Sequence, residues 1–505
     1  MKILIGFFGL LVANICSGQS TFSKTYDNSN KSLWGHSIQC DTNNIYVVGD
    51  GNTDLIGLSS FFIELDYLGN QISFNNFSKE HTAYKIGEPG TLNKLSSSTF
   101  IAGGKYSYFD TLFPINQGEH GLLYKYNKVG DTIFTRQMIG DGRTTIINTD
   151  VFNDQIYLTG YTNDTSFSVT KFYAAAFDTN GVFLWERNYN GLHHTVGIEV
   201  DHCSNGNLLL SGLYENDDIG YLTDGWLVKT NNMGEQYDDQ TYGTEFDDSG
   251  LHIKISINEK YFLAQQNLDT VINVGDYQYV RYLGKMDTSG NFIWRTFFNQ
   301  VYFFDIFNFR ELSDGNIIIC GIKRESEFGY LLGDIMKLDS NGIKLWERTF
   351  YTRLDRDNYF NDVQQTPDKG FILTGTAWGP VNQDMWLVKL DSMGCLVPGC
   401  DETPIISFPK NEDAIFSIYP NPVSNSSIVE IHIPSSFETI TGEKLELNIF
   451  DITGKLVDRY SNISVSNPNE TIRFNIYNKN LAKGLYEASL SYGGNQLGVL
   501  KIVVE

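Results

Sequence analysis

The sequence has little proline, few cysteines and a shortage of basic residues. Its 505 residues include 11 prolines and 6 cysteines, and 37 lysines and arginines stand against 60 aspartates and glutamates. The resulting formal charge of −23 opposes binding to a nucleic-acid backbone or to an anionic membrane. No segment shows sustained helical periodicity, and no apolar run after the N-terminus approaches the ~20 residues of a membrane helix. We therefore expect no nucleic-acid partner and no transmembrane segment.

The common catalytic and cofactor motifs are also missing. There is no nucleophile elbow, zincin helix, phosphate loop, dinucleotide fingerprint or CxxC pair for zinc. The eight histidines are scattered, and the adjacent His193 and His194 would point to opposite faces of a strand. The acidic turns at 217–218, 238–239 and 247–248 lack the alternating aspartates of a dedicated calcium loop, although an incidental calcium ion stays open. We predict no cofactor, no metal site and no catalytic residue.

The first 18 residues resemble a secretory signal peptide. Lys2 precedes an apolar run from Ile3 to Ala13, and the small residues Ser17 and Gly18 come before Gln19. We predict cleavage after Gly18 and export of the mature chain. Cys16 raises a lipoprotein alternative, but the three residues before it match a lipobox poorly.

Export permits disulfides among the five cysteines that remain after cleavage. Cys395 and Cys400 lie five positions apart around a Pro-Gly turn, which favours a local disulfide between them. Cys40, Cys203 and Cys320 lie in apolar or strand-like runs, and we expect them to be buried single thiols.

Short β-rich runs separated by Gly, Asn and Asp occur throughout, a pattern typical of an all-β protein. Two independent glycine markers recur every 51 to 61 residues and give seven units. The first marker is a turn glycine, at Gly69, Gly130, Gly181, Gly234, Gly290, Gly342 and Gly394. The second ends an apolar run, at Gly49, Gly103, Gly160, Gly212, Ala264, Gly321 and Gly375.

The sixth unit shows the plan of one repeat. Strand-like runs at 307–314, 317–322, 333–340 and 344–351 are separated by turns that contain Gly. Four antiparallel strands repeating every ~50 residues are typical of a propeller blade. An open solenoid is less favoured because no distinct capping repeats occur.

The seventh unit lacks its fourth strand, because the cysteine loop replaces it. The segment Thr21–Asp27, directly after the signal peptide, is similar to the fourth strands of other units. We predict that it pairs with Trp386–Asp391 and closes the ring, since an open ring would leave unpaired edges. The predicted passenger is thus a seven-bladed β-propeller over 19–400, closed by an N-terminal strand.

Aromatic residues recur at one position of the repeat. Trp185, Trp294 and Trp346 fall four residues after the turn glycine, and Phe134 takes the same place. We interpret them as packing between adjacent blades, against the alternative of a row of tryptophans that stack on sugars. The shape of this repeat resembles the docking motif of quinoprotein-type propellers, whose further residues are absent, so no quinone cofactor is implied.

Two connections between second and third strands are long and aromatic, at 104–121 and 265–284. Long loops on a rigid scaffold commonly carry the binding surface. The speculative ligand-binding residues are therefore Tyr106, Tyr108, Phe109, Tyr277 and Tyr279. The alternative is that these aromatics fold back on their own blade.

After a polar linker at 401–415, a non-repeating β segment at 416–505 has the length and alternation of a small β-sandwich. It resembles the type A C-terminal sorting domain of type IX secretion system cargo from Bacteroidota. The motif residues that carry the resemblance are Pro420, Asn421, Pro422, Asp451, Gly454, Lys455, Gly484, Tyr486 and Lys501. The resemblance implies the type IX machinery as partner and a secreted or outer-membrane surface localisation.

The passenger repeats resemble propellers that are common upstream of such sorting domains, a family without a single activity. We therefore predict a non-catalytic passenger that binds a glycan or a protein. The alternative is a secreted carbohydrate-active or other hydrolase that uses the propeller channel, with two converging carboxylates.

Overall fold

The structure is a computed structural model that divides into two compact units, residues 1–398 and 399–505. The predicted signal peptide at 1–18 and the predicted linker at 401–415 lie outside the described residues. The described residues are 19–27, 31–52, 58–109, 116–138, 143–163, 169–189, 193–216, 222–273, 276–298, 303–324, 329–353, 355–379, 382–397, 400, 416–423, 425–432, 444–451, 456–464, 471–477, 481–492 and 495–504.

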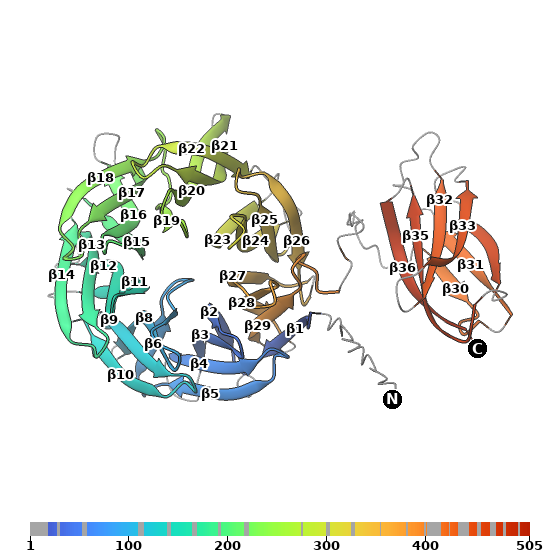
Figure 1. Ribbon diagram of the computed structural model, residues 1–505, viewed down its shortest axis with the longest axis horizontal. Coiled ribbons are helices and arrows are strands. Elements are labelled where there is room, and N and C mark those ends of the chain that lie inside the picture. Colours follow the sequence, from blue (N-terminus) through green and yellow to red (C-terminus); the bar gives the residue numbers. More distant parts are fainter. Residues whose placement is uncertain are drawn as a thin grey trace, which may run out of the picture. The chain divides into compact units, whose positions relative to one another are not determined.

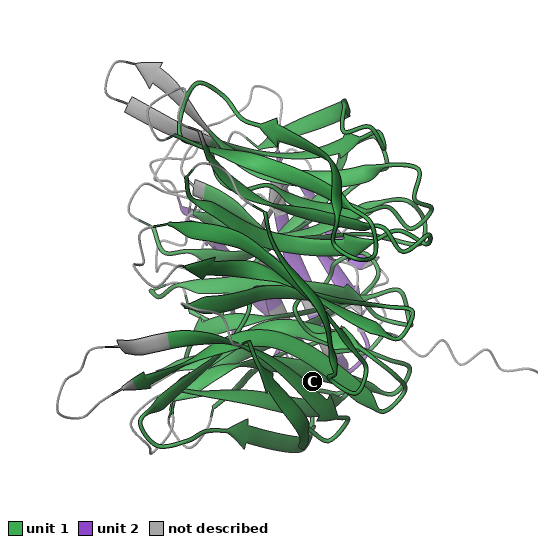
Figure 2. Cartoon of the chain, turned by 90° about the vertical axis from the view of Figure 1, so that its left-hand side faces the viewer, with its two compact units in different colours: residues 1–398 green, residues 399–505 purple. Residues whose placement is uncertain are grey.

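The described strands of the first unit form seven antiparallel sheets arranged around a ring (Figure 1). Figure 2 shows this unit from the side. We number the sheets 1 to 7 in chain order. Sheet 1 contains β2 (Leu33–Cys40), β3 (Asn44–Asn52), β4 (Leu58–Asp66) and β5 (Gln71–Phe77). Sheet 2 contains β6 (Thr82–Ile86), β7 (Asn93–Lys94), β8 (Thr99–Phe109), β9 (Asn116–Asn127) and β10 (Thr132–Gln137).

The next three sheets follow the same order from the inner to the outer strand. Sheet 3 contains β11 (Thr144–Phe152), β12 (Gln155–Asn163), β13 (Thr170–Asp178) and β14 (Phe183–Tyr189). Sheet 4 contains β15 (Thr195–His202), β16 (Leu208–Asn216), β17 (Leu222–Thr230) and β18 (Gln236–Tyr242). Sheet 5 contains β19 (His252–Ile255), β20 (Phe262–Asn273), β21 (Asp276–Met286) and β22 (Phe292–Phe298).

The last sheet joins the two ends of the first unit. Sheet 6 contains β23 (Phe303–Glu311), β24 (Ile317–Arg324), β25 (Leu332–Leu338) and β26 (Lys344–Phe350). Sheet 7 contains β27 (Asn358–Gln365), β28 (Phe371–Trp378), β29 (Gln383–Leu390) and, as its outer strand, β1 (Phe22–Tyr26).

Strand β1 takes the place that a fourth strand takes in the other sheets. It runs antiparallel to β29, with Phe22 opposite Lys389 and Tyr26 opposite Met385. The Trp386 Nε1–H donates to Ser23 Oγ at 2.9 Å. Phe22 and Tyr26 pack against the core that sheets 1 and 7 share. Residues more than 300 positions apart thus share one sheet.

The two glycine markers have different physical causes. The turn glycines between third and fourth strands all have positive φ, for example +70° at Gly234 and +101° at Gly290. Five members of the second set lie opposite a bulge of the inner strand, and a Cβ on Gly160 would lie 1.9 Å from the Thr145 carbonyl oxygen. At Gly103 the inner strand is instead divided between β6 and β7. At Ala264 the pairing of β19 with β20 shows no register shift, which leaves room for the methyl group.

In five of the seven outer strands a recurrent aromatic residue packs on the turn glycine of the next sheet. A Cβ on Gly234 would lie 2.6 Å from the Trp185 ring, and one on Gly342 would lie 2.6 Å from the Trp294 ring. Phe22 of β1 contacts Gly69 in the same way. These contacts agree with the predicted packing between neighbouring repeats rather than with a row of sugar-stacking tryptophans.

The second unit contains two antiparallel sheets around one core. One holds β30 (Phe416–Tyr419), β31 (Ser426–His432) and β34 (Thr471–Tyr477). The other holds β32 (Leu445–Asp451), β33 (Leu456–Ile463), β35 (Gly484–Tyr492) and β36 (Asn495–Val504). Val429 and Ile431 of the first sheet and Leu447 and Ile502 of the second are buried in the same cluster.

The junction of β1 with β29 contains a buried carboxylate, Asp384. Burial and the negative charge of Asp27 raise its pKa to about 6. The folded state therefore binds more protons than the unfolded state between about pH 4 and pH 6, and the free energy of unfolding falls as pH rises through this window.

Replacing Asp384 with Asn removes this buried charge. We expect Asp384→Asn to raise the free energy of unfolding at pH 7 by about 1 kcal/mol, a value reduced for solvent screening. Urea unfolding at pH 4 and pH 7 measures the effect, with the exposed Asp154 changed to Asn as control. A pH dependence of stability that is equal in wild type and Asp384→Asn would contradict this account.

Candidate functional site

The segment between β6 and β7 occupies the centre of the ring. The Gly90 N–H donates to Ser37 Oγ on β2 at 3.1 Å, and the Glu88 N–H donates to the Ile147 carbonyl oxygen on β11 at 2.9 Å. A Cβ on Gly90 would lie 3.5 Å from Asn308 Nδ2 and 3.7 Å from Lys254 Nζ. The segment therefore contacts or approaches the inner strands of sheets 1, 3, 5 and 6.

The polar side chains around this segment are bound to one another. Buried Asp362 accepts hydrogen bonds from Ser37 Oγ at 2.9 Å, from Asn308 Nδ2 at 2.7 Å and from Arg310 Nη2 at 3.1 Å. Burial raises the pKa of Glu199, but the charges and hydrogen bonds of Lys254 and His252 together outweigh it and lower this pKa to about 2. These charges are paired, so they hold the inner strands together.

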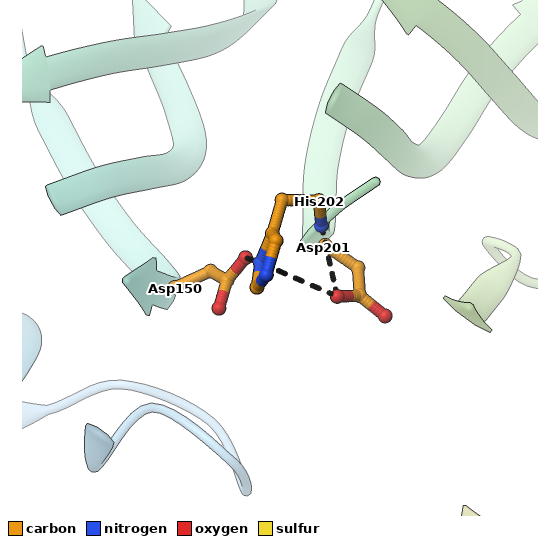
Figure 3. Close-up of side chains that lie close together, drawn as sticks. All are labelled: Asp150, Asp201 and His202. Atoms are coloured by element: carbon orange, nitrogen blue, oxygen red, sulfur yellow. Dashed lines mark hydrogen bonds and ion pairs between the residues drawn. The ribbon is translucent and has the colours of Figure 1, made fainter. Parts of the chain in front are cut away.

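A second polar cluster lies at the ends of two neighbouring inner strands. Asp150 belongs to β11, and Asp201 and His202 are the last residues of β15 (Figure 3). The His202 Nδ1 atom lies 2.5 Å from Asp150 Oδ2 and 3.9 Å from Asp201 Oδ1. The His202 ring stacks on Phe152 with centroids 4.2 Å apart. All three side chains keep 15–26% of their surface exposed.

The electrostatics of this cluster favour the retention of protons. Burial and the charge of Asp150 raise the pKa of Asp201 to about 7, despite hydrogen bonds from the Ile255 and His202 N–H groups. Burial lowers the pKa of His202, but the hydrogen bond and the charge of Asp150 outweigh it and raise this pKa. The cluster thus presents groups that can exchange protons close to neutral pH.

The same three side chains offer ligand atoms of the kinds that divalent cations take. One oxygen of each carboxylate and one imidazole nitrogen all lie within 4.8 Å of one another. The Asp150–His202 hydrogen bond already satisfies two of these groups. The sequence predicted no metal site, and in the described part of the chain this is the cluster with such spacing.

Sequence reasoning missed this cluster, although a signal for it was present. Asp150 pairs with Tyr157, and Tyr157 precedes the marker residue Gly160 by three positions. Asp201 pairs with Leu209, and Leu209 precedes the marker residue Gly212 by three positions. The two carboxylates therefore occupy the same position in successive repeats, which brings them together on adjacent inner strands.

The two connections predicted to be binding loops are mostly paired strand. β8 and β9 pair from Thr99 with Asn127 to Phe109 with Asn116, and β20 and β21 pair as far as Asn273 with Asp276. The expectation of long loops was wrong, because β-branched and aromatic residues extend both hairpins.

The predicted aromatic residues differ in exposure. Tyr106 is 8% exposed and packs against Tyr84, as the alternative of folding back on the blade required, whereas Tyr108 is 40% exposed. The Lys79 Nζ atom lies 5.7 Å from the Tyr108 ring centroid. Phe109, Tyr277 and Tyr279 have a described backbone in β8 and β21, and their side chains lie outside the description.

The cysteines divide into one pair and three single thiols. Cys395 and Cys400 are disulfide-bonded, as the sequence predicted. The thiols of Cys40, Cys203 and Cys320 are free. Cys320 is buried, whereas Cys40 and Cys203 are half-buried instead of buried as expected.

The predicted sorting residues come together in the second unit. Asn421, between Pro420 and Pro422, accepts a hydrogen bond from the Val503 N–H at 2.9 Å. Asp451 lies opposite Tyr486, whose hydroxyl donates to the Ala482 carbonyl oxygen at 2.7 Å. Gly484 begins β35, and Lys501 on β36 lies opposite Glu487 on β35. Gly454 and Lys455 lie outside the described residues.

The second unit also matches a known family. The family model of the secretion system C-terminal sorting domain matches residues 417–505. The chain is a type IX secretion system cargo protein. The cargo protein is therefore exported, and it is secreted or held at the outer-membrane surface. A search for a helix with the length and hydropathy of a membrane span finds none in the described part of the cargo protein.

No curated protein matches the cargo protein. Solved structures similar to it include an α-L-arabinanase from Penicillium chrysogenum complexed with arabinobiose, with 11% identity, a TM-score of 0.40, and coverage of 60% of this chain and 92% of that chain. An α-L-arabinofuranosidase from Fusarium graminearum has 9% identity and a TM-score of 0.38, with coverage of 59% and 91%. The polysaccharide lyase Uly1 has 8% identity and a TM-score of 0.43, with coverage of 71% and 90%. At these TM-scores the likeness carries no conclusion about the activity of the cargo protein.

Proposed function

We propose that the passenger is a seven-bladed β-propeller whose last blade is completed by the N-terminal strand, and that the sorting domain is a small β-sandwich. Support comes from the pairing of β1 with β29 and from the aromatic Phe22, which takes the recurrent outer-strand position. In this proposal the exported chain is 19–505, with a passenger at 19–400 and the sorting domain at 416–505.

We propose further that the passenger is a non-catalytic binding module for a glycan or a protein. The observation that carries this proposal is the segment around Gly90, which occupies the centre of the ring among four inner strands. A substrate that had to enter a central channel would compete with this segment for space. Binding surfaces therefore belong away from the centre of the ring. The β8–β9 hairpin presents Tyr108 and also carries Phe109, and the β20–β21 hairpin carries Tyr277 and Tyr279.

The second candidate is a hydrolase, and one observation favours it. Asp150 and Asp201 converge at the ends of two inner strands, with His202 between them. Glycoside hydrolysis requires a pair of carboxylates, one of them protonated, and Asp201 has the raised pKa of such an acid.

A combined binding and turnover assay separates the two candidates. We expect the complete exported chain to bind to immobilised glycans on an array and to release no new reducing ends from them. The variants Asp150→Asn and Asp201→Asn should bind as the wild type does. Release of reducing ends by the wild type, lost in Asp150→Asn, would overturn the binding proposal in favour of the hydrolase.

A further inference from the structure

Two of the seven contacts between neighbouring sheets lack the recurrent aromatic residue. The outer-strand position opposite the third strand is occupied by Phe22, Phe134, Trp185, Trp294 and Trp346, but by Ser73 in sheet 1 and Asp238 in sheet 4. The turn glycines that those two residues would cover are Gly130 and Gly290. Each glycine instead lines a hollow on the perimeter of the ring.

The two hollows differ in size and lining. The hollow at Gly130 measures about 160 Å³ and includes the buried residues Phe62 and Tyr126. The hollow at Gly290 is an open groove of about 550 Å³ between β18 and the turn before β22. Small-molecule sites commonly measure about 300–1,000 Å³; the groove at Gly290, although wide open to solvent, has a volume in this range, and the hollow at Gly130 is smaller.

Asp238 takes the position of the recurrent aromatic next to the larger groove, and its side chain is bound to Lys229. Its carboxylate accepts a hydrogen bond from Lys229 Nζ at 2.8 Å. Lys229 also donates to the Thr288 and Ser289 carbonyl oxygens of the next sheet, at 3.2 and 3.3 Å. This polar bridge joins sheets 4 and 5 where an aromatic ring joins other neighbours, and the Gln240 and Tyr242 side chains lie against Gly290 in place of that ring.

The groove combines two aromatic rings with planar polar groups. Tyr242 and Phe292 are half-buried, with centroids 5.8 Å apart at 79°. The Gln240 Nε2 atom donates to the Ser289 carbonyl oxygen at 2.9 Å, and Asn291 Nδ2 donates to Asp287 Oδ2 at 3.2 Å. Each amide keeps a second N–H, and these bonds fix its orientation before a ligand arrives.

The charge of the groove selects among ligands. Asp239 accepts hydrogen bonds from Trp226 Nε1 at 3.0 Å and from Gln236 Nε2 at 2.8 Å, and its carboxylate has further acceptor sites for hydroxyl groups. A carboxylate in the groove repels an anionic ligand. Aromatic rings beside fixed amides and a carboxylate suit the C–H faces and hydroxyl groups of an uncharged sugar.

We propose that the groove between β18 and the turn at Gly290 binds a neutral saccharide. This inference rests on the proposed binding function and names its site and ligand class. Here Asp238 takes the place of the aromatic residue that packs on the turn glycine between other sheets, and Gln240, Tyr242 and Asn291 line the groove.

A matched pair of variants tests the site. Asp238→Trp restores the recurrent aromatic and fills the groove, and Ser73→Trp makes the same change at the hollow of about 160 Å³. Asn291→Ala removes one exposed amide without touching the core. We expect the complete exported chain to bind at least one neutral oligosaccharide on an array of glucan, mannan, xylan, galactan and arabinan fragments, and not alginate or polygalacturonate. Asp238→Trp and Asn291→Ala should weaken this binding about tenfold or more, while Ser73→Trp should match the wild type.

The outcomes separate the site from the function. Neutral glycan binding that survives in both Asp238→Trp and Asn291→Ala would overturn the groove and leave the binding function standing. A wild-type chain that binds none of the neutral fragments would overturn the saccharide proposal, and retention of a protein partner by that chain would still support the binding function. A thermal melt of each variant shows whether it is folded, and Asn291→Ala keeps the test valid if Asp238→Trp does not fold.

Discussion

Replacing Phe22–Tyr26 with a Gly-Ser stretch of equal length should destabilise the whole passenger. The change removes five cross-strand residue pairs and takes Phe22 and Tyr26 out of the core shared by sheets 1 and 7. It also exposes the buried Trp386 and removes the acceptor of its indole N–H. We expect the free energy of unfolding to fall by about 3 kcal/mol or more, a large share of the stability of an ordinary domain.

Denaturant unfolding followed by tryptophan fluorescence measures this effect. The exposed Thr25 supplies the matched control, because Thr25→Ala alters the same strand without removing a core contact. We expect that control to remain within about 0.5 kcal/mol of the wild type. An unfolding midpoint of the Gly-Ser variant equal to that of the wild type would show that β1 does not close the ring.

A single charge in the last strand of the sorting domain should stop secretion. Ile502 is fully buried in the core of the second unit, and its neighbour Val503 is 40% exposed. An unpaired carboxylate buried at 502 would cost about 3–5 kcal/mol, enough to unfold a unit of this size. We therefore expect Ile502→Asp to leave the passenger in the periplasm.

The adjacent residue supplies the control for this prediction. Val503→Asp places the same charge on the exposed face of β36, and the Val503 N–H that bonds Asn421 is unchanged. Immunoblots of periplasm, cell surface and medium should show normal secretion of Val503→Asp. Equal secretion of Ile502→Asp and Val503→Asp would contradict a requirement for the folded sorting domain.

Most of the architecture could be predicted from the spacing of the repeats in the sequence. The positions of the turn glycines, such as Gly234 and Gly290, mark where the chain adopts positive φ between third and fourth strands. The sequence placed Thr21–Asp27 beside Trp386–Asp391, and the structure pairs Phe22–Tyr26 with Met385–Lys389. The turns follow from local chemistry that a single repeat displays, and the pairing of the two ends follows from comparing the repeats, because only the seventh lacks a fourth strand.

Several polar contacts between repeats were not predicted. The Asp150–His202 pair forms because two inner strands lie side by side, and neither repeat alone shows it. The segment around Gly90 occupies the centre because its sheet has a divided inner strand, β6 and β7, which no other copy shares in the described residues. Asp238, which takes the place of the recurrent aromatic, was a sequence signal for the groove at Gly290. The signal can be interpreted only when the structure shows that this aromatic packs on the next sheet.

The closure of the ring can be tested without altering a residue, by hydrogen exchange in the complete exported chain. The amides to follow are those of Ser23–Tyr26. If β1 is the outer strand of sheet 7, the amides that bond β29 will be protected to the same order as those between β28 and β29. Exchange of all four amides at the rate of an unstructured peptide would contradict the closed ring.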